Sequence, residues 1–384
     1  MEFKLTAAQQ EIRESIREIC ARYPDEYWRK HDAAGTYPEE FLLAMLKSGW
    51  LGALVPKEYS GKGLGMVEAS IITEEIARSG GNATSCHSQM YNLGMLVRHG
   101  SEEQKNRYLP RIASGELRFL AFGLTEHDAG LNTSRIATMA VRKGDEYIIN
   151  GHKNWISRLQ HSDLLLVVAR TTPYERAAKR TRGLSAFLVE LPTAGIEATR
   201  IPTMINLETN EVTFTDVRVP AANLIGEEGA AFKYVLRGIN GDRILAAAAC
   251  IGDARWLIER ASDYAKRRVI FDRPIGSNQS IQFPIAHSHA SVEAADMMRF
   301  KAAVCYDSLV DCGAEANIAK LLASEALAEA ANAAMQTYGG YAFAKSYDIE
   351  RKFRESRLFL NAPGSSQLIL AHIGQHVLGM PRSF

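Results

Sequence analysis

Residues 144–157 read GDEYIINGHKNWIS, and this stretch marks a change in the spacing of apolar residues along the chain. Before it the spacing is that of helices, and within it the spacing is that of strands. The dipeptide Asn150-Gly151 predicts a hairpin turn, because both residues tolerate the positive φ angles of a two-residue turn. Three further runs predict strands bounded by turn residues, namely SDLLLVVAR (162–170), GLSAFLVEL (183–191) and NEVTFTDVRVP (210–220). Together they predict a β region from about residue 119 to residue 225.

Helical patterns flank this region. In EIRESIREICARY (11–23), Ile12, Ile16 and Ile19 fall on one helix face, and PEEFLLAMLKSGWLGAL (38–54) repeats the pattern. Beyond the β region, long helical patterns cover 228–267, 280–310 and 314–338. The order predicts an α+β fold with an N-terminal helical domain (1–118), a middle β domain (119–225) and a C-terminal helical bundle (226–384).

Composition excludes several classes of protein. The 384 residues carry a formal net charge of +1, so no global field attracts nucleic acid or an anionic membrane. No apolar run approaches the ~20 residues of a transmembrane helix, and Thr6 reads as the N-cap of a first helix rather than as part of a signal peptide. The five cysteines are scattered without a CxxC pair, which favours reduced thiols over disulfides or a zinc site. We expect a cytoplasmic protein with no metal, nucleic-acid or membrane partner.

Four segments carry residue types that suit a flat, phosphorylated ligand. FGLTEHDAGLNTS (122–134) is a loop rich in glycine and hydroxyl groups, and KNWIS (153–157) offers a tryptophan with a hydroxyl two residues on. RRVIFDRPIGSNQSIQF (267–283) offers an arginine for phosphate, a phenylalanine for stacking and a glutamine for hydrogen bonds. QTYGGYAF (336–343) has two glycines that let backbone approach a ligand closely. Taken singly, each also reads as an ordinary polar turn or a core aromatic residue.

A cluster of cations lies between two of the predicted strands, at Arg170, Arg176, Lys179, Arg180 and Arg182. It reads either as a solvated hairpin loop or as a patch that steadies a phosphorylated ligand.

Taken together, the segments have the order and separations of four motifs of one family. These are TEHDAGL (125–131), GHKNWIS (151–157), RVIFDRP (268–274) and QTYGGYA (336–342). On these motifs the chain resembles the acyl-CoA dehydrogenases over nearly its whole length. The resemblance implies a β-barrel-like middle domain between helical domains, and assembly as a homotetramer or heterotetramer. It also implies FAD bound partly across a subunit interface, an acyl-CoA substrate, and an electron-transfer flavoprotein as electron acceptor.

The same resemblance implies roles for individual residues. Phe122, Leu124 and Thr125 would lie against the isoalloxazine, with Trp155 and Ser157 flanking it near N5. The neighbouring subunit would hold the pyrophosphate and adenine half through Arg268, Phe271, Gln279 and Gly340. The other cofactor contacts that it implies are Gly130, Gln336, Gly339 and Ser365, and the substrate contacts are Arg243, Asn240, Cys86 and His87.

The catalytic base is the point at which this sequence departs most from that family. Dehydrogenation needs a carboxylate that removes the α-proton of the thioester while the β-hydrogen leaves as hydride. Most members carry this glutamate in a C-terminal [YF]-E-G-T motif, where this chain has NAPGSS (361–366) with Pro363 at the glutamate position. Isovaleryl-type members place it on the first long helix of the C-terminal domain, which corresponds to Asp242 in GINGDRIL (238–245).

Spacing supports Asp242 independently of the family. It falls on the apolar face of its helix, at a 4-3-4-3 spacing with Val235, Ile239, Ala246 and Ala249. Burial there would make the carboxylate a stronger base. Two alternatives stay open: Asn240-Gly241 breaks the helix and Asp242 caps its continuation, or Asp242 forms a salt bridge with Arg243.

Other differences from the family motifs leave more than one function possible. Leu131, His127 and Asp272 replace a serine, a proline and a glycine of the family motifs, and aspartate is one methylene shorter than glutamate. A misplacement of about 1 Å can cost about 10²-fold in rate. The main expectation is FAD-dependent α,β-dehydrogenation of an acyl-CoA with an unusual branched or cyclic acyl group. The alternatives are a non-catalytic subunit of a heteromeric assembly, a flavin oxidase or monooxygenase, and a dehydrogenase of carrier-protein thioesters.

Overall fold

The computed structural model describes residues 4–382, and the described chain divides into two compact units. One comprises the described residues of Met1–Phe41, Gly65–Thr84 and Asn240–Phe384, and the other comprises Leu42–Leu64 and Ser85–Ile239. The first unit is mainly helical and the second is built around a β-sheet. Helix α7 (Ala231–Arg267) contributes residues to both, and α3 (Glu39–Lys47) spans another boundary between them.

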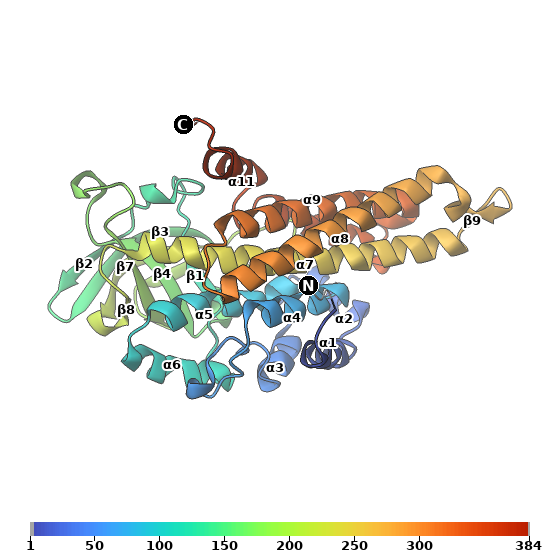
Figure 1. The fold of residues 1–384 in the computed structure, drawn as a ribbon. Coiled ribbons are helices and arrows are strands. Elements are labelled where there is room, and N and C mark those ends of the chain that lie inside the picture. Colours follow the sequence, from blue (N-terminus) through green and yellow to red (C-terminus); the bar gives the residue numbers. More distant parts are fainter. Residues whose placement is uncertain (1–3, 383–384) are drawn as a thin grey trace. The chain divides into compact units, whose positions relative to one another are not determined.

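The β-sheet unit contains a mixed sheet, drawn in green in Figure 1, with the strand order β6-β7-β3-β2-β4-β5-β8. Strand β1 pairs in parallel with β4. The strands are β1 (Ala121–Gly123), β2 (Met139–Lys143), β3 (Glu146–Ser157), β4 (Leu164–Arg170), β5 (Leu184–Glu190), β6 (Ile196–Arg200), β7 (Thr209–Pro220) and β8 (Leu224–Ile225). The three strands predicted after residue 160 are therefore confirmed as β4, β5 and β7.

Two apolar clusters cover the faces of this sheet. Leu166 of β4 belongs to the cluster that also contains residues of α5 (His87–His99) and α6 (Glu102–Ala113). Its neighbour Val167 belongs to the second cluster, together with Phe187 of β5. Successive side chains of a strand point to opposite faces, so a strand covered on both sides reads as an unbroken apolar run, as LLLVVA does here.

The hairpin turn predicted at Asn150-Gly151 is wrong. Strand β3 runs through that dipeptide, and the chain reverses instead at Gly144, which has φ +62°. Gly151 lies at a register shift between β3 and β7, and a Cβ there would come within 2.6 Å of Thr138 Oγ1. The glycine therefore permits a close approach at a bulge rather than a turn.

The helical unit is a bundle whose long helices α8 and α9 lie side by side (Figure 1). Its elements are α1 (Ala7–Cys20), α2 (Asp25–Ala34), α4 (Met66–Arg78), α8 (Gln279–Asp307), α9 (Gly313–Tyr338), α10 (Ile349–Ser356), α11 (Ser366–His372) and the hairpin strands β9 (Val269–Ile270) and β10 (Arg273–Pro274). The three long helices predicted after the β region are confirmed. Thr6 is the predicted N-cap of α1, because its hydroxyl accepts the N–H of Gln9 at 3.2 Å.

Helix α7 continues through Asn240-Gly241 without a break. A Cβ at Gly241 would lie 3.1 Å from Met66 Cε and 3.2 Å from the hydroxyl of Tyr306, so this glycine allows close packing inside the unit. The alternative in which Asp242 caps a restarted helix is therefore excluded.

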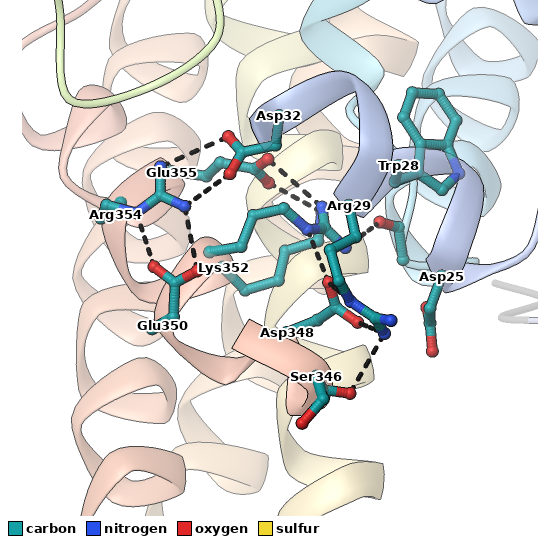
Figure 2. Close-up of polar contacts among 12 residues, drawn as sticks. Asp25, Trp28, Arg29, Asp32, Ser346, Asp348, Glu350, Lys352, Arg354 and Glu355 are labelled. Atoms are coloured by element: carbon teal, nitrogen blue, oxygen red, sulfur yellow. Dashed lines mark hydrogen bonds and ion pairs between the residues drawn. The ribbon is translucent and has the colours of Figure 1, made fainter. Parts of the chain in front are cut away.

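The cation-rich segment YDIERKFRESRLF (347–359) is held by carboxylates of the helical unit (Figure 2). Arg354 Nη2 lies 2.7 Å from Asp32 Oδ2 of α2. Lys352 is buried, and its Nζ lies 2.6 Å from Asp253 Oδ1 of α7. Since one partner removed from a buried ion pair leaves an uncompensated charge, these cations have a structural role.

Within residues 4–382, no helix is both long enough and apolar enough to cross a membrane. The same described residues contain no group of three or more histidine, cysteine or acidic side chains arranged to hold a metal ion. The five cysteines all lie among these residues, and no disulfide joins any two of them.

Candidate active site

In the β-sheet unit, strands β1 and β3 bring together the residues expected at the flavin ring. Phe122 lies on β1, and Leu124 and Thr125 follow it directly. The N–H of Asn154 donates to the carbonyl of Thr125 at 2.8 Å, which places this loop beside Trp155. Trp155 has φ +63° at a register shift of β3, and 58% of it is exposed. Its indole is therefore accessible to a planar ligand.

Ser157 lies two residues beyond Trp155 on β3, with its hydroxyl 3.4 Å from that of Thr209 on β7. An indole and a hydroxyl thus stand at one end of the strand, as the sequence interpretation expected.

Two motif residues, Lys153 and Glu126, form a buried ion pair to which our sequence interpretation assigned no role. Lys153 Nζ donates to Glu126 Oε1 at 2.8 Å and to the carbonyl of Leu124 at 3.0 Å. Glu126 also accepts the N–H groups of Ala137 at 2.6 Å and Thr138 at 3.0 Å. The pair therefore fastens both ends of the loop between β1 and β2 to β3. The sequence signal was present, because both residues belong to the motifs TEHDAGL and GHKNWIS.

Burial and mutual attraction oppose each other in this pair. Burial lowers the pKa of Lys153 to about 8, against the attraction of Glu126. Burial would raise the pKa of Glu126, but the charge of Lys153 and the N–H of Ala137 hold it below its ordinary value. Both groups are therefore charged at neutral pH.

The rest of this loop is open to solvent. Nothing lies within 4 Å of a Cβ built at Gly130, and Leu131 is 62% exposed. His127 is exposed beside Asp128. The loop therefore leaves room for a ligand at Gly130, while Leu131 offers no hydrogen bond in place of the family serine.

The cation cluster between β4 and β5 separates into two kinds of residue. Arg170 is buried, and its guanidinium donates to the carbonyls of Ile136 at 2.7 Å and Arg182 at 3.2 Å. It braces two loops from within the unit. Lys179 and Arg180 are exposed in the loop itself.

Cys86 and His87, which the resemblance places at the substrate, lie at the start of α5 and are buried. The rings of His87 and Tyr91 are one helical turn apart, with centroids 5.5 Å from each other. The ring of Tyr91 lies 6.5 Å from that of Phe122 on β1. His87 therefore belongs to a row of three rings that ends at the expected flavin contact.

In the helical unit, five residues expected to contact the cofactor line one cavity of about 790 Å³. Arg268, Phe271 and Gly340 are those expected at its pyrophosphate and adenine half, and Gln336 and Gly339 are further expected contacts. No atom lies within 4 Å of a Cβ built at Gly339 or Gly340, so the backbone there is open. The guanidinium of Arg268 lies 5.8 Å from the ring centre of Tyr341, which also lines the cavity. Gln279 begins α8, between the lining residues Asn278 and Ser280.

Asp242 lies on the unbroken part of α7 and is half-buried. Its neighbour Arg243 donates from Nη1 to Asn240 Oδ1 at 3.1 Å, and the Nε of Arg243 is buried without a hydrogen-bond partner. Burial lowers the pKa of Arg243 to about 10, and the negative charge of Asp242 acts in the opposite direction. The structure thus brings the expected base together with both expected substrate contacts of α7.

The turn NAPGSS (361–366) lies beside this group. A Cβ at Gly364 would be 3.6 Å from Arg243 Nη2, and the Gly364 carbonyl accepts a hydrogen bond from Lys320 Nζ at 2.8 Å. Ser365 caps α11, because its hydroxyl accepts the N–H of Leu368 at 3.2 Å. Ser365 thus has a structural partner, and Pro363 has no side chain that can accept a proton.

Family models cover most of the chain. The acyl-CoA dehydrogenase N-terminal domain matches residues 6–116, the middle domain matches residues 121–217 and the C-terminal domain matches residues 229–378. This combination of domains defines an oxidoreductase that acts on CH–CH bonds. The chain belongs to the acyl-CoA dehydrogenase family.

Several known proteins are similar to this chain over most or nearly all of its length. The acyl-CoA dehydrogenase FadE12 of Mycobacterium tuberculosis (strain H37Rv) is 37% identical over 386 residues, which cover 98% of this chain and 97% of that protein. The caffeyl-CoA reductase-Etf complex subunit CarC of Acetobacterium woodii is 34% identical over 342 residues, covering 88% of this chain and 89% of the relative. The solved structure of a glutaryl-coenzyme A dehydrogenase with glutaryl-CoA is 30% identical with a TM-score of 0.93, covering 100% of this chain and 98% of that one.

Proposed function

We propose that this chain catalyses FAD-dependent α,β-dehydrogenation of an acyl-CoA thioester, with Asp242 as the base. One observation carries the proposal: Asp242 stands on α7 next to Arg243, and Arg243 adjoins the turn in which Pro363 occupies the usual glutamate position. A carboxylate is thus available near the position where most relatives would present theirs.

The chemistry divides between cofactor and chain. When bound, FAD supplies a hydride acceptor at N5. Asp242 removes the α-proton, for which it must be ionised and partly desolvated. Its half-burial meets the second condition.

Two groups of residues fit FAD, each within its own unit. The β-sheet unit offers the exposed indole of Trp155 and the hydroxyls of Thr125 and Ser157 to the ring. The helical unit offers a cavity in which Arg268 pairs with phosphate and the open backbone at Gly339 and Gly340 approaches the ligand.

A cyclic or branched acyl group suits the row formed by His87, Tyr91 and Phe122. The three rings form edge-on and tilted pairs, and apolar groups pack against the faces and edges of aromatic rings. A long unbranched acyl chain would gain less from such a surface.

Assembly with further copies of the chain would cover an exposed apolar hairpin. Phe271 is 93% exposed, and Val269 and Ile270 are 54% and 44% exposed. Large exposed apolar patches mark interaction sites, and this one adjoins the cavity assigned to FAD. We also propose that the chain forms a tetramer and acts in the cytoplasm. Within each chain, we propose three domains with boundaries near residues 118 and 225. The name of CarC pairs it with Etf, which supports an electron-transfer flavoprotein as acceptor.

Anaerobic titration of the purified flavoprotein with a panel of acyl-CoAs tests the function. We expect a cyclic or branched thioester to bleach the flavin absorbance of the wild type, and Asp242→Asn to lower the rate by at least 10²-fold while leaving FAD content unchanged. Undiminished bleaching in that variant would refute the base assignment. A protein that no thioester bleaches would be a non-catalytic subunit, and turnover with oxygen alone would indicate an oxidase.

A further inference from the structure

Lys320 on α9 is a buried amine that the proposed chemistry does not itself use. Its side chain has no exposed surface, and its Nζ donates to the carbonyl of Gly364 at 2.8 Å. Gly364 is in the turn NAPGSS (361–366), where the usual catalytic glutamate of the family is missing. The lysine therefore connects helix α9 to the turn in which Pro363 occupies the position of the usual glutamate.

A buried ammonium needs a reason, because removing a charge from water is costly unless an opposite charge replaces the solvent. Lys352 in the same unit has such partners, since its Nζ lies 3.0 Å from Oε2 of Glu355 (Figure 2). The same nitrogen lies 2.6 Å from Asp253 Oδ1. The hydrogen bond of Lys320 goes to a neutral carbonyl instead. Burial accordingly lowers the pKa of Lys320 to about 8.

Lys320 lies close enough to the proposed base to be affected by it, because the charges of Arg243 and Asp242 of α7 and of Glu325 of α9 act on its amine. The turn makes a second connection, because Gly364 stands against Arg243.

We propose that Lys320 is a positioning residue, which fixes the turn at Gly364 against Arg243 beside the proposed base. This inference rests on the proposed function, in which Asp242 is the base.

The test compares the rate of flavin reduction by the best acyl-CoA of the panel across pH 6–9 for three lysine variants. Lys320→Met removes the charge and keeps the length, Lys320→Arg keeps a charge within reach of the carbonyl, and Lys352→Met is the matched control. We expect Lys320→Met to lower the limiting rate at least tenfold at every pH and to change the substrate dissociation constant less than threefold, because a displaced turn at Gly364 disturbs the reacting geometry. Lys320→Arg should restore most of the rate.

The control separates positioning from general destabilisation. Lys352→Met removes an equally buried amine and should lower thermal stability, but its limiting rate should stay within threefold of the wild type. If Lys320→Met keeps the wild-type limiting rate, or if both variants lower the limiting rate alike, the proposal is wrong.

A measurement without turnover distinguishes this inference from the proposed function. Hydrogen–deuterium exchange of residues 360–366 should accelerate in Lys320→Met and stay at the wild-type rate in Lys352→Met. Unchanged exchange in Lys320→Met would overturn the role of Lys320 whatever the enzyme does. Faster exchange in a protein whose flavin no thioester reduces would instead overturn the proposed function and, with it, the catalytic part of the role.

Discussion

Breaking the buried pair of Lys153 and Glu126 should destabilise the β-sheet unit far more than removing both charges together. The perturbations are Lys153→Met, Glu126→Gln and the double variant. Lys153 has no exposed side-chain surface and Glu126 retains 10%, and their charged atoms are 2.8 Å apart. At an effective dielectric constant of about 20, two charges at that distance attract by roughly 6 kcal/mol before the cost of desolvation.

Each single variant leaves one buried charge without its partner, which costs about 3–5 kcal/mol. Lys153→Met also frees the carbonyl of Leu124. Glu126→Gln keeps only one oxygen, so either Ala137 or Thr138, whose N–H groups bond to different oxygens of Glu126, loses its acceptor. We therefore expect the two single variants to be similarly harmful. The double variant leaves no buried charge, so its loss should fall short of the sum of the singles by about 2 kcal/mol or more.

Urea unfolding, followed by tryptophan fluorescence and by the release of FAD absorbance, measures this cycle. Matched preparations of the four proteins at pH 7 give the coupling energy from the four unfolding free energies. Additivity within about 0.5 kcal/mol would refute the reasoning, because it would mean that the two side chains do not stabilise one another. We also expect the flavin to dissociate more readily from both single variants, since the pair holds the loop that carries Thr125.

Three further predictions concern pH, cofactor and assembly. Burial, followed by the charges of nearby cations, lowers the pKa of His99 to about 4, so below its ordinary 6.5 the unfolded chain takes up the proton first and stability falls as pH drops toward 4. Between pH 7 and 4.5 the wild type should therefore lose about 1–2 kcal/mol more than His99→Phe, which keeps the stacking on Tyr234; parallel curves from urea titrations would contradict this. Trp155→Ala should weaken FAD binding about tenfold by the loss of a stacking face, with little change in unfolding free energy. Fluorescence titration of the apoprotein with FAD measures the affinity, and an unchanged dissociation constant would contradict this prediction. Phe271→Asp should shift the protein to smaller oligomers in analytical ultracentrifugation without altering its circular dichroism, and an unaltered sedimentation coefficient would count against the assembly.

The fold was predictable wherever apolar spacing alone decided the element. The continuous apolar run of β4 follows from burial on both faces of the strand, and the periodic patterns of α7, α8 and α9 follow from the burial of helix faces. Asn150-Gly151 misled, because glycine serves a tight turn and a close backbone approach equally well. Only the position of Thr138 on the neighbouring segment decides between them, and no local pattern contains that information.

The candidate site shows the same division. Phe122, Thr125 and Trp155 could be brought together in advance because family motifs contain them. Asp242 came from the position of the base in isovaleryl-type members, and the spacing of its helix supported it. The ion pair of Lys153 and Glu126 was missed, because charged residues are seldom fully buried and burial was therefore not expected for either of them. The role of Arg170 could not be decided from the sequence for a related reason. In the sequence it is one of several cations of a loop, and only its burial against five carbonyls distinguishes it from the others.

Lys153, Lys320 and Lys352 share a geometry that makes them chemical reporters. Each amine is buried and donates to a loop carbonyl, of Leu124, Gly364 and Gly81 respectively. An amine-reactive reagent can reach such a nitrogen only while its loop is open, so the rate of labelling at each lysine measures the opening of one defined segment. Mass spectrometry of the labelled chain, with and without cofactor and thioester, would then time three local motions in the same sample. The buried cations that order these loops thus also make their opening measurable.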